Sequence, residues 1–215
     1  MNAVSRPSTT VDLPEDYAAA AERFAAAVGA TDLRAPVPAC PGWSAYDLVV
    51  HLGNVHAWAA TIVETGRRAA EQNDRPRSSR ARSVREWYLA KAEDLYQVLR
   101  CIPSDRPCWN FVFGEGVADF WRRRQLHETT VHRIDLDVVA GRVSDPAPEV
   151  AVDGVSEVLE VMLTRALQRG HRLRLDAPVQ LVATDTGDSW VVSPLQRSRP
   201  GVPRESSGSP PGRRA

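Results

Sequence analysis

Three ionisable residues, Glu128, His132 and Asp135, share one face of a predicted helix with apolar side chains. At 100° per residue, the same face carries four valines and a tryptophan, namely Val117, Trp121, Val131, Val138 and Val139. We expect this face to be turned to the interior, because apolar residues mark the buried side of an amphipathic helix. A buried ionisable group must be paired or must bind a metal. The sequence therefore predicts a polar site set into an apolar core.

The opposite face of this predicted helix has the composition of a solvated surface. It carries three arginines and an aspartate, Arg122, Arg123, Arg133 and Asp137. Charged side chains opposite an apolar stripe are typical of a helix face in contact with water. We therefore expect these four residues to be exposed.

Glu128 and His132 have the spacing of two metal ligands on one helix. They are four residues apart, so their side chains leave the same face about one turn from each other. His51 lies beside the apolar stripe of another predicted helix and is the best third ligand, since bundles often build metal sites from facing helices. Two imidazole nitrogens and one carboxylate oxygen suit zinc and leave a fourth position open, as in catalytic sites. The spacing alone is equally compatible with a surface pair or a buried hydrogen-bonded pair.

Asp135 and Arg124 are candidates for a supporting role around these ligands. Asp135 follows His132 by three residues and is placed to accept a hydrogen bond from the imidazole, which would fix its tautomer. Asp135 is equally well placed to form an ion pair with Arg124, which lies at the near edge of the same face. Arg124 is also the arginine of this segment best placed to bind a substrate carboxylate. Both alternatives remain open from the sequence.

The other histidines and the cysteines are given structural roles. His127 is an alternative to His132 but lies near the edge of the face, and His56 is expected to be a hydrogen-bonded residue on a helix flank. The three cysteines form no C-x-x-C pair and are expected to be small buried hydrophobes; they are Cys40, Cys101 and Cys108. The three tryptophans that lie in or beside predicted helix stripes, Trp43, Trp58 and Trp121, are expected in the core.

Periodicity and capping residues predict a mainly helical chain. Five helices are expected over 12–29, 44–66, from Ser83 to before Pro103, 117–140 and 148–170. Ser44 with Asp47 and Ser83 with Glu86 have the spacing of capping boxes at the second and third helix starts. The aromatic segment 104–116 is predicted to be extended. The pattern then alternates, which predicts two strands over 172–184 and 190–192 with a turn at 185–189.

The composition excludes several classes of protein. The 27 basic and 27 acidic residues balance, and the arginine-rich segment 67–82 has no interleaved aromatic residues, so neither nucleic acid nor a membrane is an expected partner. No apolar stretch reaches the length of about 18 residues that a bilayer span needs. The start of the chain lacks the apolar core of a signal peptide, and the sparse cysteines suggest a reducing compartment. We therefore expect a cytoplasmic protein.

Two segments resemble a known family when they are taken together. These are CPGWSAYDLVVHLGNVHAW and FWRRRQLHETTVHRIDLD. With their separation, they resemble the mycothiol-dependent maleylpyruvate isomerase family, part of the wider DinB-like group of metal-binding four-helix bundles. The resemblance covers roughly residues 15–195. It implies a divalent metal, usually zinc, held by the histidine of W-x-x-x-D-L-x-x-H-L and by the glutamate and histidine of H-E-x-x-x-H. Here these positions are His51, Glu128 and His132.

The resemblance also implies an activity, a cofactor and a fold. The family's thiol cofactor, mycothiol, is thought to add at the metal to the cis double bond of maleylpyruvate, and elimination after rotation gives the trans product. The implied partners are a small electrophilic substrate and a low-molecular-weight thiol. Alternative functions are a mycothiol-dependent S-transferase acting in detoxification, a metal-binding bundle without catalysis, and a degenerate truncated paralogue. The expected fold is mainly α: a DinB-like four-helix bundle with a fifth helix and a short C-terminal β-hairpin, the remnant of an α/β domain.

The expected organisation of the chain has four parts. Residues 1–11 are a disordered lead-in, and residues 12–170 form the metal-binding helical bundle domain. Residues 171–194 form a partial C-terminal α/β domain, and residues 195–215 form a disordered tail rich in proline, serine, glycine and arginine. Because family members often carry a complete C-terminal domain over the site, the last two parts are expected to be a truncated or frameshifted remainder.

Overall fold

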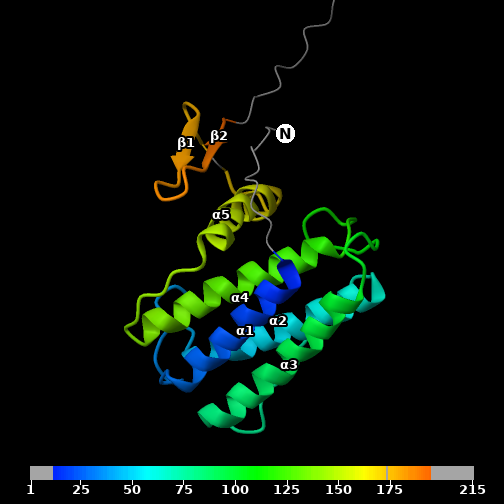
Figure 1. Cartoon of the computed structure of the whole chain (residues 1–215), viewed down its shortest axis with the longest axis vertical. Coiled ribbons are helices and arrows are strands. Elements are labelled where there is room, and N and C mark those ends of the chain that lie inside the picture. The colour runs from blue at the N-terminus through cyan, green and yellow to red at the C-terminus, as the bar shows by residue number, and fades with distance from the viewer. Residues whose placement is uncertain (1–11, 173, 195–215) are drawn as a thin grey trace, which may run out of the picture.

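The computed structural model describes residues 12–172 and 174–194. Its main body is a bundle of four long helices: α1 (Leu13–Gly29), α2 (Ala45–Thr65), α3 (Ala81–Cys101) and α4 (Asp119–Val139). Each helix packs against two others, in the order α1, α3, α2, α4 and back to α1, which closes the bundle (Figure 1). The predicted four-helix bundle is confirmed. The lead-in 1–11 and the tail 195–215, both predicted to be disordered, lie outside the described residues.

The two predicted capping boxes have different outcomes. At the start of α2, the Ser44 hydroxyl accepts a hydrogen bond from the Asp47 backbone N–H at 3.2 Å, and the Asp47 carboxylate accepts one from the Ser44 backbone at 3.0 Å. This box is confirmed. The box at Ser83 and Glu86 is wrong, because α3 begins two residues before Ser83. The Glu86 carboxylate instead accepts a hydrogen bond from Arg82 at 2.8 Å, which uses it within the first turns of the helix.

Helix α4 is rotated relative to the face predicted from its apolar residues. Val131 and Val138, expected inside, are each 53% exposed. The buried stripe runs instead through residues of mixed polarity, Trp121, Gln125, Thr129 and Leu136. Gln125 and Thr129 are buried but polar, so apolar periodicity does not count them as part of the buried face. The predicted face is therefore shifted around the helix, away from these two residues and toward the exposed valines.

The face of α4 that was predicted to be solvated is covered. All four of its charged residues are buried or nearly so, namely Arg122, Arg123, Arg133 and Asp137. Arg123 pairs with Asp153 at 2.9 Å and Glu160 at 2.6 Å, both from the next helical segment. Arg133 pairs with Asp137 at 2.9 Å, and Arg122 donates to the Leu99 carbonyl at 2.7 Å. The prediction of exposure was wrong because each charge finds a partner that compensates its burial.

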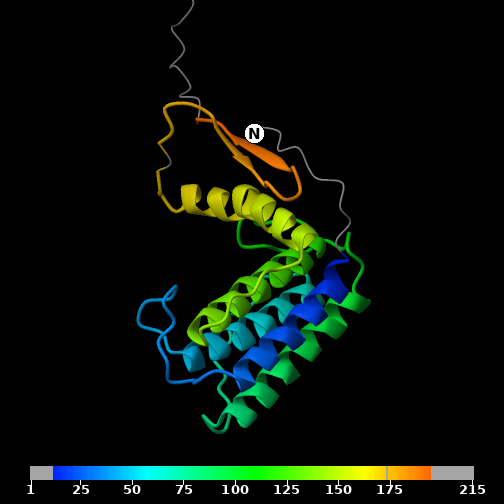
Figure 2. The same ribbon diagram turned by 60° about the vertical axis from the view of Figure 1, so that its left-hand side comes forward.

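The fifth helix forms in three consecutive pieces: α5 (Pro148–Glu157), a π-helical turn η1 (Val158–Met162) and α6 (Leu163–Gln168). The predicted start at Pro148 and end before Gly170 are confirmed, whereas the π-helical turn was not predicted. This helix lies across one end of the bundle, over α4 (Figure 2). It therefore covers the part of the charged face of α4 that contains Arg123.

Two short strands, β1 (Val179–Val182) and β2 (Ser189–Val192), form the predicted antiparallel hairpin. The first strand is shorter than the predicted range 172–184. The hairpin lies on the side of the fifth helix away from the bundle (Figure 2). Trp190 is its one buried residue among those described, and its indole N–H donates to the Ser156 hydroxyl of α5 at 2.9 Å. This contact ties an otherwise marginal two-stranded sheet to the helical part.

The aromatic segment before α4 is a compact loop, and the predicted extended piece is reduced to isolated bridges. These bridges pair Pro107 with Val117 and Asn110 with Gly114. Trp109 and Phe111 pack onto the core, and the Trp121 indole donates to the Trp109 carbonyl at 2.7 Å. The loop therefore places an aromatic wall at the end of the bundle that the fifth helix crosses.

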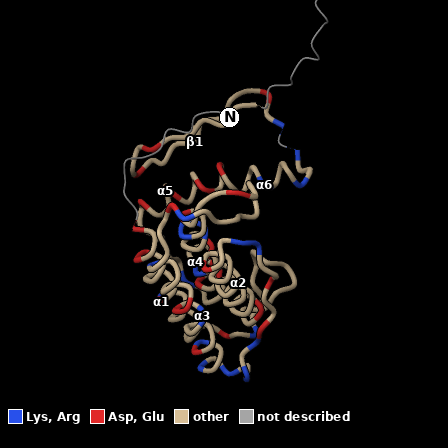
Figure 3. Tube along the Cα trace, turned by 90° about the vertical axis from the view of Figure 1, so that its right-hand side faces the viewer, with Lys and Arg blue, Asp and Glu red and all other residues tan. Residues whose placement is uncertain are grey.

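Along the described part of the trace, acidic and basic residues are interspersed (Figure 3). Of the helices that the structure describes, none is both long and apolar enough to cross a membrane.

A histidine lies in the centre of the bundle. His56 is fully buried, with Nδ1 2.9 Å from the Gln125 side-chain oxygen and Nε2 3.3 Å from the Tyr88 hydroxyl. A neutral imidazole with its proton on Nδ1 satisfies both contacts, since Nδ1–H donates and Nε2 accepts. Burial lowers the pKa of His56 to about 4. The predicted hydrogen-bonded role of His56 is confirmed, whereas its predicted place on a helix flank is wrong, because the residue is fully buried.

This buried histidine predicts a loss of stability in mild acid. Below pH 6.5 the unfolded chain takes up a proton at His56 that the folded protein excludes until about pH 4. The free energy of unfolding should therefore fall by about 3 kcal/mol from this residue between pH 6.5 and pH 4. Urea unfolding of wild type and His56→Gln from pH 7 to pH 4 measures it. The variant should lose less stability, while His171→Gln at an exposed position should follow the wild type. Parallel curves for wild type and His56→Gln would contradict the prediction.

Candidate functional site

The three residues predicted as metal ligands come together between α2 and α4. Glu128 Oε1 lies 3.4 Å from His51 Nε2 and 3.4 Å from His132 Nε2. One ligand atom from each residue lies within 4.8 Å of the other two. The convergence follows from the fold, because α2 and α4 pack as neighbours and the spacing of four puts Glu128 and His132 on one face of α4.

The distances in this cluster are within hydrogen-bond reach but longer than charge-assisted hydrogen bonds, and they also match the spacing of ligands around one cation. A charge-assisted N–H···O bond to a carboxylate is about 2.7–2.9 Å long. Ligand atoms about 2.05 Å from a tetrahedral zinc ion lie about 3.3 Å apart. The Nε2 atoms of both imidazoles lie 3.4 Å from the same carboxylate oxygen, which is close to this distance between two ligands of one zinc ion. The donor set of two nitrogens and one oxygen also fits zinc.

Asp135 orients one of the two imidazoles. Its carboxylate lies 2.9 Å from His132 Nδ1. Of the two roles left open by the sequence, the structure shows this hydrogen bond, and Arg124 pairs elsewhere. Because Nδ1 is used by Asp135, Nε2 is the ring nitrogen that faces Glu128. Burial opposes a charge on His132, but its hydrogen bonds to Asp135 and Glu128 outweigh burial and raise its pKa to about 9. The cluster therefore favours positive charge.

Arg124 holds the other oxygen of the central carboxylate. It donates to Glu128 Oε2 at 2.7 Å and to Glu157 of α5, and both Arg124 and Glu157 are buried. Burial raises the pKa of Glu128, but the two histidines and Arg124 together hold it well below its usual range. Glu128 is therefore an ionised carboxylate with Oε2 already paired and Oε1 directed to the imidazoles.

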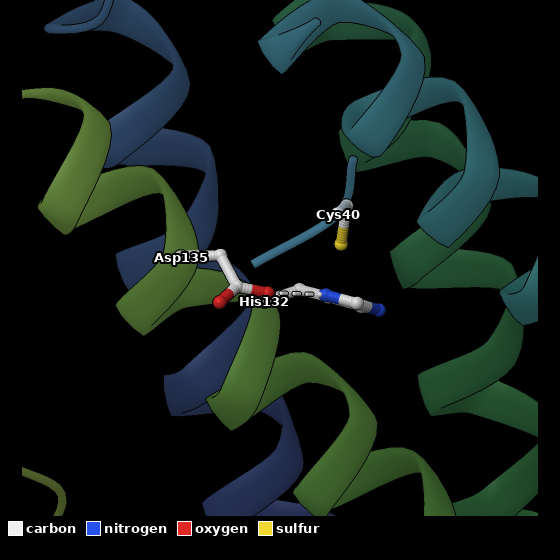
Figure 4. A group of neighbouring side chains, drawn as sticks. All are labelled: Cys40, His132 and Asp135. Carbon is white, nitrogen blue, oxygen red and sulfur yellow. Dashed lines mark hydrogen bonds and ion pairs between the residues drawn. The ribbon is translucent and has the colours of Figure 1, made fainter. Parts of the chain in front are cut away.

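A cysteine that sequence analysis placed among the buried hydrophobes lies on the other side of His132. Ligand atoms of Cys40, His132 and Asp135 fall within 4.8 Å of one another (Figure 4). Burial, Asp135 and Glu128 raise the pKa of the Cys40 thiol. No spacing rule could have found it, because Cys40 lies in an irregular segment rich in proline. The expectation of burial also fails for Cys101, which is exposed.

Aromatic residues position the remaining ligand. The Trp43 ring packs on His51 with centroids 4.9 Å apart, and the His51 and His132 rings lie edge to face at 5.5 Å. Trp43 and Trp58 are only partly buried, whereas Trp121 is in the core as predicted. His51 and Glu128 line a cavity of about 230 Å³, whose wall includes Trp58, Phe111, Trp121, Arg124 and Arg165. Two of the three predicted ligands, His51 and Glu128, are thus accessible from a cavity with aromatic side chains in its wall.

His127, the alternative ligand, belongs to a different cluster. It is buried, and its Nε2 lies 2.7 Å from Asp153, which also pairs with Arg123. Burial raises the pKa of Asp153, but His127 and Arg123 bring it down to about 2. His127 therefore anchors α5 to α4 and takes no part in the site between α2 and α4.

A family comparison agrees with this geometry. The profile described as mycothiol maleylpyruvate isomerase N-terminal domain matches residues 15–137, more than half of the chain. The chain belongs to this family. The mycothiol maleylpyruvate isomerase match spans the four-helix bundle up to Asp137 and contains His51, Glu128 and His132, whereas the fifth helix and the hairpin lie outside it. The fold is accordingly a DinB-like bundle with a fifth helix and a short hairpin. No curated protein and no solved structure matches the chain.

The buried ion pairs around Glu128 predict a strong dependence of stability on Arg124. Arg124→Met leaves Glu157 and Glu128 without their cation, so the free energy of unfolding should fall by about 3–5 kcal/mol. Adding Glu157→Gln removes one stranded charge and should recover a large part of the loss. Urea unfolding of the single and double variants measures both effects.

The matched control is Arg82→Met, which breaks an exposed ion pair on α3. This change should leave the free energy of unfolding unchanged within error, because exposed pairs contribute little. An Arg124→Met variant as stable as wild type would show that the buried pairs do not compensate one another as described.

Proposed function

We propose that the chain binds a divalent metal, with zinc the best candidate, through His51, Glu128 and His132. The metal serves a mycothiol-dependent isomerase of the maleylpyruvate type, which converts a cis double bond to trans. The observation that carries this proposal is the single Glu128 oxygen 3.4 Å from both imidazole nitrogens. Membership of the mycothiol maleylpyruvate isomerase family supports the thiol and the substrate class.

The residues around the ligands have distinct tasks in this proposal. When bound, the metal lowers the pKa of a thiol so that a thiolate exists at neutral pH. Asp135 holds the proton on His132 Nδ1, so that Nε2 stays free to act as a ligand. Arg124 keeps Glu128 ionised and fixes its rotation. Trp58 and Phe111 line the adjoining cavity and limit the access of water to the ligands.

A mycothiol-dependent S-transferase is the second candidate function. It needs the same metal and the same thiolate, and differs only in that the thiol stays attached to the product. The observation that favours it is a further cavity of about 860 Å³ beside the first, because a volume of this size suits ligands larger than a short-chain acid. A metal-binding bundle without catalysis is the third possibility, and metal binding without turnover would support it.

Metal content tests the ligand set directly. Purified wild-type protein should hold close to one zinc per chain by mass spectrometry, and His51→Ala should hold almost none. His171→Ala removes an exposed histidine outside the cluster and should keep the metal. Asp135→Asn should bind zinc about 10–100-fold more weakly, since it loses the partner that orients His132. Equally low zinc in wild type and His51→Ala would refute the proposed site.

Turnover tests the reaction. Zinc-loaded protein with maleylpyruvate and mycothiol should form the trans product, and omission of either the thiol or the metal should abolish it. A panel of other electrophiles with mycothiol, followed by mass spectrometry of thiol adducts, separates the transferase from the isomerase. Stable adducts without isomerisation would replace the first function by the second. Metal binding without either product would leave only the non-catalytic bundle.

A further inference from the structure

A larger cavity adjoins the one at the proposed metal site. It measures about 860 Å³ and lies between α2, the loop that follows it, the aromatic loop and α6. Trp58, Glu71, Phe111 and Arg165 line both cavities. Because they share these four side chains, the two cavities are neighbours, and we call the larger one, which contains neither His51 nor Glu128, the outer cavity. Its volume lies within the range of about 300–1,000 Å³ that is usual for small-molecule sites.

The outer cavity has an excess of positive charge. Three arginines line it, Arg68, Arg165 and Arg169, against a single glutamate, Glu71. Within the described part of the chain, none of these three arginines forms an ion pair, whereas the four arginines of α4 are all bound to protein oxygens. Burial lowers the pKa of Arg165, and the positive charge of the neighbouring Arg169 lowers it further, because two cations close together repel each other. An anion in this cavity would relieve that repulsion.

Aromatic rings hold two of these arginines toward the cavity. The Arg165 guanidinium carbon lies 4.3 Å from the Phe111 ring centroid, and that of Arg68 lies 5.6 Å from the Trp109 ring. Trp58 joins the same wall, with its ring 6.2 Å from Trp109 and 6.3 Å from Phe111. Stacking on a ring restrains a guanidinium group without using its N–H donors, so the donors stay available to a ligand.

We propose that the outer cavity is the subsite for the electrophilic substrate and that it selects an aromatic carboxylate. Arg165 pairs with the carboxylate, because a planar guanidinium group binds it through two parallel hydrogen bonds. The ring of the substrate packs against Trp58, Trp109 and Phe111. This assignment rests on the proposed thiol-dependent function in its S-transferase form, because it favours substrates larger than a short-chain acid such as maleylpyruvate.

Binding of a non-reactive probe tests the subsite on the zinc-loaded full chain. The probe is 2-naphthoate, and its neutral isostere 2-naphthamide reports the contribution of the ring alone. Titration calorimetry should show that wild type binds the acid at least about 10-fold more tightly than the amide, as expected for charged hydrogen bonds. Arg165→Gln should remove this preference for the acid, while its affinity for the amide stays unchanged. Arg165→Lys, which keeps the charge, should restore part of the preference.

The control Arg23→Gln changes an exposed arginine of α1 that lines neither cavity and should bind both probes like the wild type. Equal affinity of wild type for acid and amide, or an unchanged preference in Arg165→Gln, would overturn the proposal. Zinc content is measured on the same samples. A protein without zinc that still binds 2-naphthoate through Arg165 would refute the proposed function and keep the subsite. A zinc-loaded, active protein that binds 2-naphthoate no more tightly than 2-naphthamide would refute the subsite and keep the proposed function.

Discussion

The Glu128 carboxylate is the charge on which the site depends. A carboxylate removed from water carries a penalty of several kcal/mol unless both oxygens are compensated. Arg124 compensates Oε2, and the two imidazoles approach Oε1 without closing to ordinary hydrogen-bond length. Compensation on one side is therefore permanent and built into the fold. On the other side it comes from two imidazoles, which in the proposed site exchange a proton for a metal ion.

The fifth helix makes this arrangement possible. Arg124 needs a second anion to balance it in the interior, and Glu157 of α5 supplies one. Arg123 is held in the same way by Asp153 and Glu160. The bundle and the fifth helix are thus joined through buried charges in addition to apolar contacts, among them Val150 of α5, which belongs to the hydrophobic core. Buried ion pairs stabilise an interface no more than hydrophobic contacts of similar size do. They make the position of the fifth helix on α4 specific, because any other position would leave buried charges unpaired.

The sequence was sufficient to predict the helices and the convergence of His51, Glu128 and His132, but not the orientation of α4. Helix ends followed from local signals such as the Ser44–Asp47 box, and the spacing of Glu128 and His132 put them on one face whichever way the helix turned. The buried face was misjudged because Gln125 and Thr129 occupy it, while Arg133 and Asp137 are buried as a pair. An analysis of one helix assumes one buried face, whereas α4 is covered by the bundle on one side and by α5 on another. Contacts between distant segments, such as that of Cys40 with His132, leave no local signal at all.

The two parts of the chain contribute different components to the site. The segment that matches the family supplies the three proposed ligands, their partner Asp135 and the aromatic wall. The segment beyond residue 137 supplies Arg165 and the anions that fix the arginines of α4. Because the arginines of α4 are bound internally, positive charge for a ligand has to come from outside the bundle core. In the proposed function, metal chemistry and substrate selection can therefore change separately, since a substitution on α6 alters the cavity without touching a proposed ligand.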